Sequence, residues 1–438
     1  MRDTIHEAPK AVRDRRRGGL VATVLGFMAT LTAGEALASP SPFTDFRDAR
    51  PGQSHHIGVD DLPPPHATRS VDNGPRIVPR PRDAWPQVPA GFKVTLYAQG
   101  LSDPRLLRVS PAGDVFVSES KPGRITLLVG VTGDGRAKET TTFATGLDKP
   151  FGLAFYPPGP EPAWLYVGET GAVVRFPYRN GDRKARGPKQ VIARLPSGGL
   201  LRGGGHWTRD LVFSPDGKTL FVSVGSFSNN DDTDDEKERA DILRMSPTGE
   251  GRAIHAAGLR NAVGLAVQPG TGELWASVNE RDELGDDLVP DYLTHVEPGG
   301  FYGWPWFYIG AHVDPKHRGK HPELAAKVIV PDVLLQPHFA SLALCFYGGE
   351  AFPAAYRGDL FAAEHGSWNR AKRAGYEVIR VPFGQGARPV GGYEDFLTGF
   401  VTPRGEVWGR PVGVDVAHDG ALLVSDDAGN VVWRVSHP

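Results

Sequence analysis

Apolar and polar residues alternate in short runs along most of this 438-residue chain. From Gly91 onward one run follows another, and glycine, proline or aspartate interrupts the chain between them. Alternation with a period of two is typical of β-strands, and these residues favour the turns that join strands. The pattern therefore predicts strand after strand and an all-β fold.

The predicted strands are organised into a repeated unit. Each copy has a polar or proline-containing loop, an apolar strand, a turn such as Pro-x-Gly or Asp-Gly, and a second apolar strand. The first strands of six copies fall at 104–109, 150–155, 210–213, 263–267, 343–347 and 411–416. Copies about 45 to 70 residues apart, each with room for about four strands, indicate propeller blades. We predict a six-bladed β-propeller of four-stranded antiparallel blades; a pair of β-sandwiches, which would not repeat the unit, is the alternative.

The chain before the repeats divides in two. Residues 1–38 have the features of a signal peptide: arginines at 13 and 15–17, an apolar stretch from Leu20 to Leu31, and the small-x-small sequence Ala36-Leu37-Ala38. The apolar stretch is short for a membrane span. We therefore expect cleavage and a periplasmic or secreted protein rather than an uncleaved anchor, with twin-arginine export left open. For residues 39–88 we predict an extended lead-in that wraps the domain or stays mobile. Residues 89–438 are predicted to form the propeller.

Composition narrows the classes of partner and cofactor. The chain has 49 basic and 51 acidic residues, so its charge does not favour nucleic acid, and a small polar substrate fits better. Cys345 is the single cysteine, which excludes an internal disulfide, a cysteine-based zinc cage, an iron–sulfur cluster and covalent haem. Nucleotide-binding glycine motifs and a Gly-x-Ser-x-Gly elbow are missing from suitable contexts, which disfavours Rossmann-type oxidoreductases and serine hydrolases.

Polar residues next to the repeated strands are the candidate site, because loops between blades converge at one end of a propeller channel. His206 follows three glycines just before the third copy, where an imidazole could act as a general base. Arg260 and Asn261 hold the same place before the fourth copy, and a guanidinium there suits a carboxylate or a quinone oxygen. For both positions, an exposed loop remains the alternative.

Acidic and aromatic loops add further candidates. The run from Asn279 to Asp287 is rich in the oxygen donors that calcium requires, although it lacks EF-hand spacing. A second acidic run, at 231–238, is better explained as a solvated loop. Aromatic or arginine-containing loops at 299–305, 366–370 and 409–411 could stack on a planar cofactor or add positive charge.

Six motifs occur in a fixed order along the chain. They are His206 after its glycine run, Gly258-Leu259-Arg260-Asn261, Asn279-Glu280-Arg281-Asp282 with Leu284-Gly285-Asp286-Asp287, Gly300-x-Tyr302-Gly303-Trp304-Pro305, Gly366-Ser367-Trp368-Asn369-Arg370, and Gly409-Arg410-Pro411. Together, over about residues 90–437, they resemble the glucose/sorbosone dehydrogenase family, the soluble quinoprotein aldose dehydrogenases. The likeness is greater to the L-sorbosone dehydrogenase branch.

The resemblance implies a six-bladed propeller that holds pyrroloquinoline quinone (PQQ) beside a calcium ion at the channel mouth. Such an enzyme oxidises an aldose or a sugar aldehyde such as sorbosone by hydride transfer to the quinone. His206 matches the catalytic base, and Arg260 the arginine that polarises a quinone oxygen. The resemblance places quinone contacts at Arg260, Asn261, Trp368, Asn369, Arg370 and Arg410. It places calcium at the segment that contains Arg281, Asp282, Glu283, Asp286 and Asp287, through backbone carbonyls of the turn around Arg281–Glu283.

Two positions depart from the family pattern. Soluble glucose dehydrogenase has an aspartate before its catalytic histidine, where this chain has Gly205, and its cofactor-binding lysine falls near Asn369 and Arg370. A calcium-dependent lactonase on a similar scaffold and a non-catalytic binding propeller are the alternative functions. A dehydrogenase without a haem motif needs a separate electron acceptor, such as a cytochrome or a membrane quinone. No nucleic-acid partner is expected, and the oligomeric state is left open.

Overall fold

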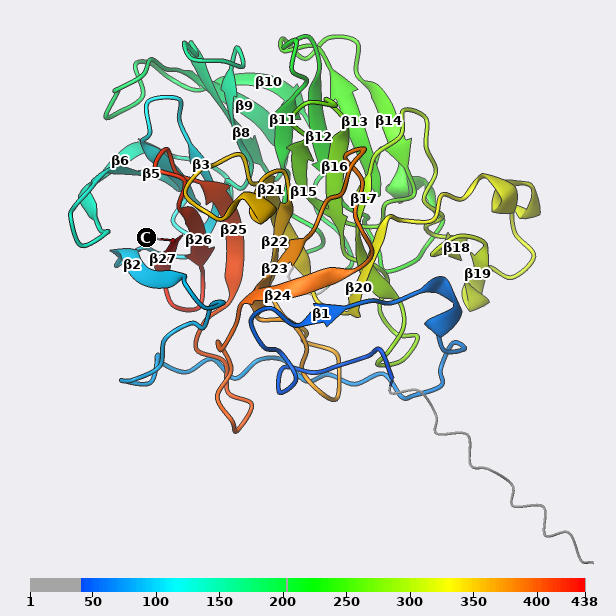
Figure 1. The fold of residues 1–438 in the computed structure, drawn as a ribbon. Helices are drawn as coiled ribbons and strands as arrows, with labels where there is room; N and C mark the ends of the chain where they lie inside the picture. Colours follow the sequence, from blue (N-terminus) through cyan, green and yellow to red (C-terminus); the bar gives the residue numbers. More distant parts are fainter. Residues whose placement is uncertain (1–40, 202–203, 438) are drawn as a thin grey trace, which may run out of the picture. The chain divides into compact units, whose positions relative to one another are not determined.

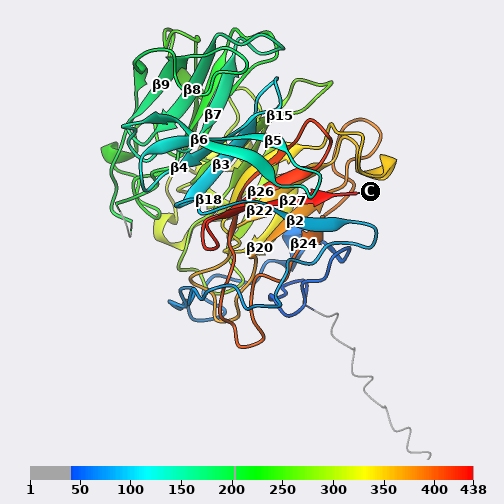
Figure 2. The same cartoon turned by 90° about the vertical axis from the view of Figure 1, so that its left-hand side faces the viewer.

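Six antiparallel sheets stand around a common axis as the blades of a β-propeller (Figures 1 and 2). The computed structural model describes residues 41–201 and 204–437, so the predicted signal peptide lies outside the described residues. The described helices are five short 3-10 turns, η1 (Val59–Asp61), η2 (Asp234–Glu236), η3 (Pro315–His317), η4 (Pro322–Lys327) and η5 (Ala354–Tyr356). The prediction of an all-β, six-bladed propeller of four-stranded blades is confirmed. No helix in the described part of the chain is long and apolar enough to cross a bilayer.

The first four blades each consist of strands that follow one another along the chain. Blade one contains β3 (Pro104–Val109), β4 (Val115–Glu119), β5 (Arg124–Val131) and β6 (Ala137–Thr145). Blade two contains β7 (Leu153–Tyr156), β8 (Trp164–Glu169), β9 (Ala172–Pro177) and β10 (Gln190–Arg194). Blade three contains β11 (Leu211–Phe213), β12 (Leu220–Val224), β13 (Asp241–Met245) and β14 (Ala253–Ala257). Blade four contains β15 (Ala262–Val267), β16 (Leu274–Val278), β17 (Pro290–His295) and β20 (Val333–Pro337), with the hairpin β18 (Phe307–Tyr308) and β19 (His312–Val313) inserted before β20.

The last two blades recruit strands from the N-terminal part of the chain. Blade five contains β21 (Ser341–Phe346), β22 (Leu360–Glu364), β23 (Glu377–Val381) and β24 (Tyr393–Leu397), and β1 (Ser54–His55) pairs with β24 as a fifth strand. Blade six contains β25 (Pro411–Val416), β26 (Leu422–Asp426) and β27 (Val431–Ser436). Its outermost strand is β2 (Lys93–Gln99), which pairs antiparallel with β27 beside it in Figure 1. The two ends of the propeller sequence therefore close the ring within one sheet, which removes a pair of open edges.

Neighbouring blades approach so closely near the axis that serine and glycine stand at the contacts. Ser118 in β4 donates its hydroxyl hydrogen bond to Phe151 O of the next blade at 2.9 Å, and Ser425 in β26 bonds in the same way to Arg105 O. A Cβ on Gly413 in β25 would lie 2.6 Å from that Arg105 oxygen. These contacts fix the innermost strands relative to one another, so the loops at their ends are held on a rigid frame.

The lead-in lies along blades five and six. Besides the pairing of β1, the Asn73 N–H donates to Trp368 O at 2.7 Å and the Gln87 N–H to Thr398 O at 2.9 Å. Buried backbone groups of an irregular segment need such partners. The contact with Trp368 carries the lead-in to the end of the propeller where the candidate residues gather.

A row of buried carboxyl groups crosses blade five. Glu364 in β22 and Glu377 in β23 are directly opposite in the strand register, and His55 Nε2 lies 2.9 Å from Asp395 Oδ1 at the outer edge. Burial, together with the neighbouring acids Asp291 for Glu364 and Asp395 for Glu377, raises the pKa of both glutamates well above its usual value. Both glutamates therefore hold a proton more tightly in the folded protein than in the unfolded chain.

We expect Glu377→Gln to raise the melting temperature by a few degrees at pH 8 and to change it little at pH 5. A carboxyl whose pKa is raised by folding stabilises the fold fully below its unfolded pKa and loses that contribution as the pH rises through the folded pKa. Glutamine keeps the shape of the protonated acid and cannot ionise. Thermal unfolding followed by circular dichroism between pH 5 and 9 measures the effect, with Glu161→Gln at an exposed position as the control. Parallel pH profiles for Glu377→Gln and the parent protein would contradict the expectation.

Candidate active site at the channel mouth

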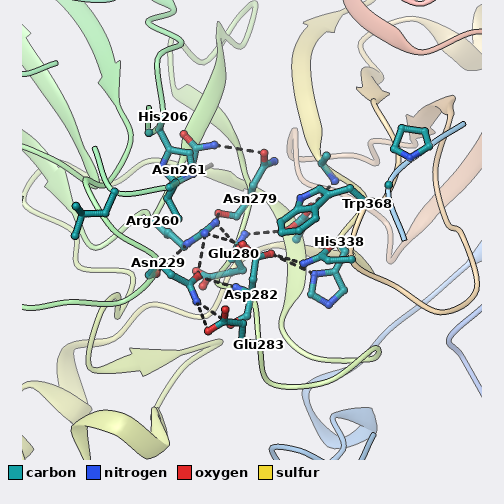
Figure 3. A pocket seen from close by; sticks show the side chains of 18 of the residues that line it. His206, Asn229, Arg260, Asn261, Asn279, Glu280, Asp282, Glu283, His338 and Trp368 are labelled. Carbon is teal, nitrogen blue, oxygen red and sulfur yellow. Dashed lines mark hydrogen bonds and ion pairs between the residues drawn. The ribbon is translucent and has the colours of Figure 1, made fainter. Parts of the chain in front are cut away.

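A cavity of about 770 Å³ opens where the innermost strands of blades three to six begin (Figure 3). The residues just before those strands face it: His206 before β11, Arg260 and Asn261 before β15, His338 before β21, and Arg410 before β25. Its wall is completed by Gly74, Pro75, Leu200, Leu201, Gly205, Asn229, Asn279, Glu280, Asp282, Glu283, Asp291, Ala340, Trp368 and Asn369. Because each blade contributes the loop before its inner strand, residues far apart in the sequence meet here.

His206 presents one ring nitrogen to the cavity as a proton acceptor. Its Nδ1 lies 3.1 Å from Ser226 O, which can only accept a hydrogen bond, so Nδ1 carries the hydrogen. Ser226 Oγ, 3.2 Å from the same nitrogen, already donates to Ser228 O and therefore accepts as well. Nε2 is then the unprotonated nitrogen. Burial, and after it the charge of Arg260, lowers the pKa of His206 well below its usual value, so the ring is neutral near pH 7.

Two glycines make the position of His206 attainable. Gly205 has a φ of +92°, and a Cβ there would lie 2.7 Å from Gly198 O, so this backbone has no room for an aspartate side chain. A Cβ on Gly225 would lie 2.6 Å from His206 Cβ. The departure noted at Gly205 therefore belongs to the way this loop packs, because glycine alone adopts that conformation without strain.

Arg260 is buried, and its N–H groups are all directed at protein acceptors. Nε donates to Asn229 O at 3.1 Å, Nη1 to Glu280 O at 2.6 Å and, more weakly, to Asn279 O at 3.4 Å. Nη2 donates to Asn229 Oδ1 and to Asp282 Oδ2, both at 3.0 Å (dashed lines in Figure 3). Arg260 therefore offers the cavity a fixed positive charge next to His206, and no spare donor.

Asp282 is the carboxylate around which the positive groups gather. Its Oδ1 accepts from Asn369 Nδ2 at 2.6 Å and lies 3.6 Å from His338 Nδ1. Burial alone would raise its pKa, but Arg260, then His338 and Asn369, lower the pKa of Asp282 below its usual value. The same contact with Asp282 raises the pKa of His338 although burial opposes it.

Two other acids of the cavity are affected in the opposite way. Burial raises the pKa of Glu280 to about 7 and that of Asp291 to about 6. Near neutral pH Glu280 is therefore only partly ionised, and the cavity carries less negative charge than its acids suggest.

The residues of the predicted calcium segment point in different directions. Asp282 and Glu283 line the cavity, whereas Arg281 turns away and binds Asp314 at 2.9 Å. Asp287 pairs with Arg370 at 2.6 Å. Asp286 lies outside the cavity, where both of its carboxylate oxygens accept from the Ala371 N–H at 3.1 Å.

Two backbone carbonyls in or next to this turn already have protein partners. Glu280 O accepts from Arg260, and Asp282 O accepts from Arg281 Nε at 2.8 Å and from Asn229 Nδ2 at 3.1 Å. Nowhere in 41–201 and 204–437 do three or more His, Cys, Asp or Glu side chains form a group that could hold a metal ion. The segment therefore offers calcium no cluster of side chains, and one carbonyl of the Arg281–Glu283 turn, Asp282 O, already accepts two hydrogen bonds.

Arg410 is the cavity arginine with donors to spare. Its Nε donates to His365 O at 3.2 Å and its backbone N–H to Asp426 Oδ1 at 2.8 Å, while its two terminal nitrogens bond to no described residue. Arg370, in contrast, does not line the cavity, because its guanidinium is committed to Asp287 and to Thr44 O. Trp368 is 39% exposed, and its ring lies at the rim of the cavity (Figure 3).

Sequence reasoning missed several residues of the wall. His338 lies just before β21, the same place that His206 and Arg260 hold in their blades. The search for polar residues next to the repeated strands could therefore have found it. The fifth copy of the repeat was the least regular, which hid it. Asn229, which holds Arg260 with both its backbone and side-chain oxygens, has no sequence signal. Gly74 and Pro75 reach the cavity from the lead-in through tertiary contacts alone.

The chain is similar to known proteins over most of its length. The TrAA12-like family matches residues 86–299 and 310–438. An uncharacterised protein of Borreliella burgdorferi is 30% identical over 359 residues, which cover 80% of this chain and 90% of that protein. An aldose sugar dehydrogenase of Escherichia coli K12 is 27% identical over 206 residues, and this match covers 42% of this chain and about half, 52%, of that enzyme.

A solved structure has the same fold. The holo form of the PQQ domain of a pyranose dehydrogenase from Coprinopsis cinerea superposes with a TM-score of 0.67, at 21% identity, over 82% of this chain and 98% of that domain. At this identity the likeness concerns the fold, a six-bladed ring. The site must be judged on the residues that this chain places around its cavity.

Proposed function

The chain belongs to the TrAA12-like family, and we propose that it is a sugar dehydrogenase that uses PQQ bound in the channel-mouth cavity. The single observation that carries the proposal is the meeting of an unprotonated imidazole nitrogen on His206 with two arginines, Arg260 and Arg410, at one cavity. The names of two similar proteins, an aldose sugar dehydrogenase and the PQQ domain of a pyranose dehydrogenase, support the same reaction class.

The cavity has the chemistry that PQQ requires. PQQ is a planar tricarboxylate, and the free terminal nitrogens of Arg410 offer paired, permanently charged donors to a carboxylate. Asn369 Oδ1, Asn261 Oδ1 and Glu280 Oε1 are buried around the cavity without a partner in the described part of the chain. Buried polar atoms normally have partners, so orphaned atoms around a cavity indicate a ligand. The half-exposed ring of Trp368 gives a flat surface for stacking.

When bound, PQQ would supply a two-electron acceptor for hydride. His206 Nε2 takes the proton of the substrate hydroxyl as a hydride leaves the carbon that bears this hydroxyl. Such a base contributes about 10²–10⁴-fold to the rate. Ser226 holds the Nδ1 hydrogen and so keeps the ring in the orientation and tautomer that this step needs. Arg260 and Arg410 stabilise negative charge that develops in the cavity during the reaction. The low pKa of His206 returns the proton readily to solvent.

The residues of the cavity fit the quinone, and no step of the proposal passes through a metal ion. Arg281 donates to Asp282 O, one of the carbonyls at which calcium was expected, and Arg260 donates to the neighbouring Glu280 O. The lactonase alternative needs carboxylates gathered on a central metal, which the described residues do not form. The binding-propeller alternative leaves the unprotonated Nε2 of His206 without a role.

The finer features of the proposal extend the sequence predictions. We propose an aldose or a sugar aldehyde, of which sorbosone is one example, as the substrate, and a separate cytochrome or membrane quinone as the electron acceptor. Export to the periplasm or the medium is proposed on the signal-peptide features of residues 1–38.

Titration of the purified apoprotein with PQQ tests the proposal. We expect saturable binding near one equivalent and, with it, reduction of an artificial dye by at least one sugar in a panel of aldoses, sorbosone and simple alcohols. The titration is run with calcium and with a chelator. Equal activity with calcium and with the chelator would show that the positively charged side chains suffice. Activity only in the presence of calcium would support a calcium ion at the Arg281–Glu283 turn. Binding without dye reduction for any sugar would contradict the proposed function.

A further inference from the structure

A second hollow, which we call the outer groove, lies beside the active-site cavity. Its volume is about 360 Å³, and it is lined by residues 231–234, 236–241, 254, 257–258, 301 and 304–306. The linings of the two hollows are in direct contact. Trp304, on the groove side, donates its Nε1 hydrogen bond at 2.9 Å to the backbone oxygen of Asn229, which lines the cavity. A ligand in the groove would therefore lie next to a ligand in the cavity.

The groove contains a buried acid that no described residue satisfies. Asp241, the first residue of β13, is 5% exposed and lines the groove, and its carboxyl group makes no hydrogen bond or ion pair within 41–201 and 204–437. Burial, and then the nearby charges of Glu238 and Glu236, raises the pKa of Asp241 to about 8. Near neutral pH this group is a neutral acid, which can both donate and accept a hydrogen bond.

Four of the other acids of the groove have protein partners. Glu236 accepts from the N–H groups of Phe227 and Ser228 at 2.7 and 2.8 Å. Glu238 pairs with Arg252. Asp231 and Asp232 pair with Lys316 and Lys320. Among the described residues these acids form no group that could hold a metal ion. Asp241 is a buried acid of the groove that is left for a ligand, and Nη1 of Arg239, which also lines the groove, is likewise buried without a partner in the described residues.

Two aromatic side chains also line the groove. Phe301 and Trp306 are half-buried with ring centres 6.1 Å apart, and both line the groove. Trp306 is held from two sides, by Asp232, which accepts from its Nε1 at 3.3 Å, and by the ring of His321 at 4.2 Å. A fixed indole face in the same groove as an uncharged hydrogen-bonding group suits the apolar face and the hydroxyl groups of a sugar ring.

We propose that the outer groove is a second sugar-binding subsite, which holds a non-reacting pyranose unit of an oligosaccharide through Trp306, Phe301 and Asp241. This inference rests on the proposed function and deepens it, because it makes an oligosaccharide, rather than a free monosaccharide, the preferred substrate. The reacting unit occupies the cavity at His206, and the next units extend past the surface of Asn229 and Trp304 to the groove.

Binding of trisaccharides to the apoprotein tests the inference without the cofactor. Isothermal titration with cellotriose, maltotriose and xylotriose is expected to find at least one ligand. For that ligand, Trp306→Ala and Asp241→Leu each weaken the affinity at least about fivefold, the size of a lost hydrogen bond or ring contact. Trp85→Ala, at a 46% exposed tryptophan outside the groove, is the matched control and keeps the parent affinity.

Stability and kinetics separate a binding role from a structural one. Because Asp241 has no partner to lose among the described residues, Asp241→Leu should keep or raise the melting temperature while it weakens binding. In the quinone-loaded enzyme, both groove variants should raise KM for the trisaccharide and leave kcat and KM for a free aldose within about twofold. This division is expected because a contact outside the reacting centre contributes to binding and not to the chemical step.

The inference and the proposed function can fail separately. Trisaccharide binding that both variants weaken, in a protein that never reduces dye, would support the groove and overturn the proposed function. Dye reduction with free aldoses, combined with trisaccharide affinities that neither variant changes, would overturn the groove. Binding of tetramethylammonium and of no trisaccharide would also overturn it, because the groove would then be a cation site.

Discussion

Replacement of His206 by alanine is expected to lower kcat for sugar oxidation by about 10²–10⁴-fold and to leave the affinity for PQQ nearly unchanged. The residue supplies an unprotonated Nε2 to the cavity, and its hydrogen bond through Nδ1 goes to Ser226 and not to a ligand. The loss should therefore fall on the proton-transfer step. Single-turnover reduction of the quinone-loaded protein measures that step, and equilibrium titration measures quinone affinity.

The pH profile gives a second readout of the same residue. Because the pKa of His206 lies well below its usual value, the base stays unprotonated as the pH falls, so kcat/KM of the parent enzyme should persist below about pH 6.5. His56→Ala, at an exposed histidine, is the control and should leave both rate and profile unchanged. A His206→Ala protein that retains its turnover would remove the base from the proposal.

Replacement of either cavity arginine by methionine should have a different main effect: on the stability of the fold for Arg260 and on quinone affinity for Arg410. Arg260→Met is expected to destabilise the fold by about 3–5 kcal/mol, because it leaves the Asp282 carboxylate without its charged partner and the Glu280 carbonyl without its donor. Arg410→Met removes a guanidinium whose side chain makes one hydrogen bond to the described part of the protein, to His365 O. It should leave the fold nearly as stable and weaken PQQ binding by about 10- to 100-fold, the value of a charge-assisted hydrogen bond.

Urea unfolding and quinone titration of both variants separate these roles. Arg260→Lys is the matched control for Arg260→Met, because it keeps the charge and loses the fork of donors. Equal quinone affinity in the parent protein and Arg410→Met would contradict the assignment of Arg410 as the ligand for a PQQ carboxylate. Equal stability of the parent protein and Arg260→Met would contradict the interpretation of Arg260 as a buried clamp.

The blades could be predicted because their signals are local. The predicted first strands at 104–109 and 411–416 coincide with β3 and β25, where alternation and a bounding turn occur together. Closure of the ring by β2 and extension of blade five by β1 could not be predicted. These pairings join strands that lie more than 300 residues apart, and the sequence of an edge strand does not name its partner.

The site was predicted in part for the same reason. Position before an inner strand correctly placed His206, Arg260, Asn261 and Arg410 around one cavity. The directions of the side chains were beyond sequence reasoning. Arg370 turns to Asp287, and the carbonyls near Asp282 accept from Arg260 and Arg281, because charged groups in a protein interior find whichever partner the packing brings close.

A crystal structure of the protein soaked with PQQ is the most direct test of quinone binding at the channel mouth. We predict the quinone in the channel-mouth cavity, with a carboxylate on the free nitrogens of Arg410 and with His206 Nε2 facing the space above the quinone ring where a sugar hydroxyl would lie. A quinone found elsewhere, or a cavity that stays empty at saturating PQQ, would contradict this prediction.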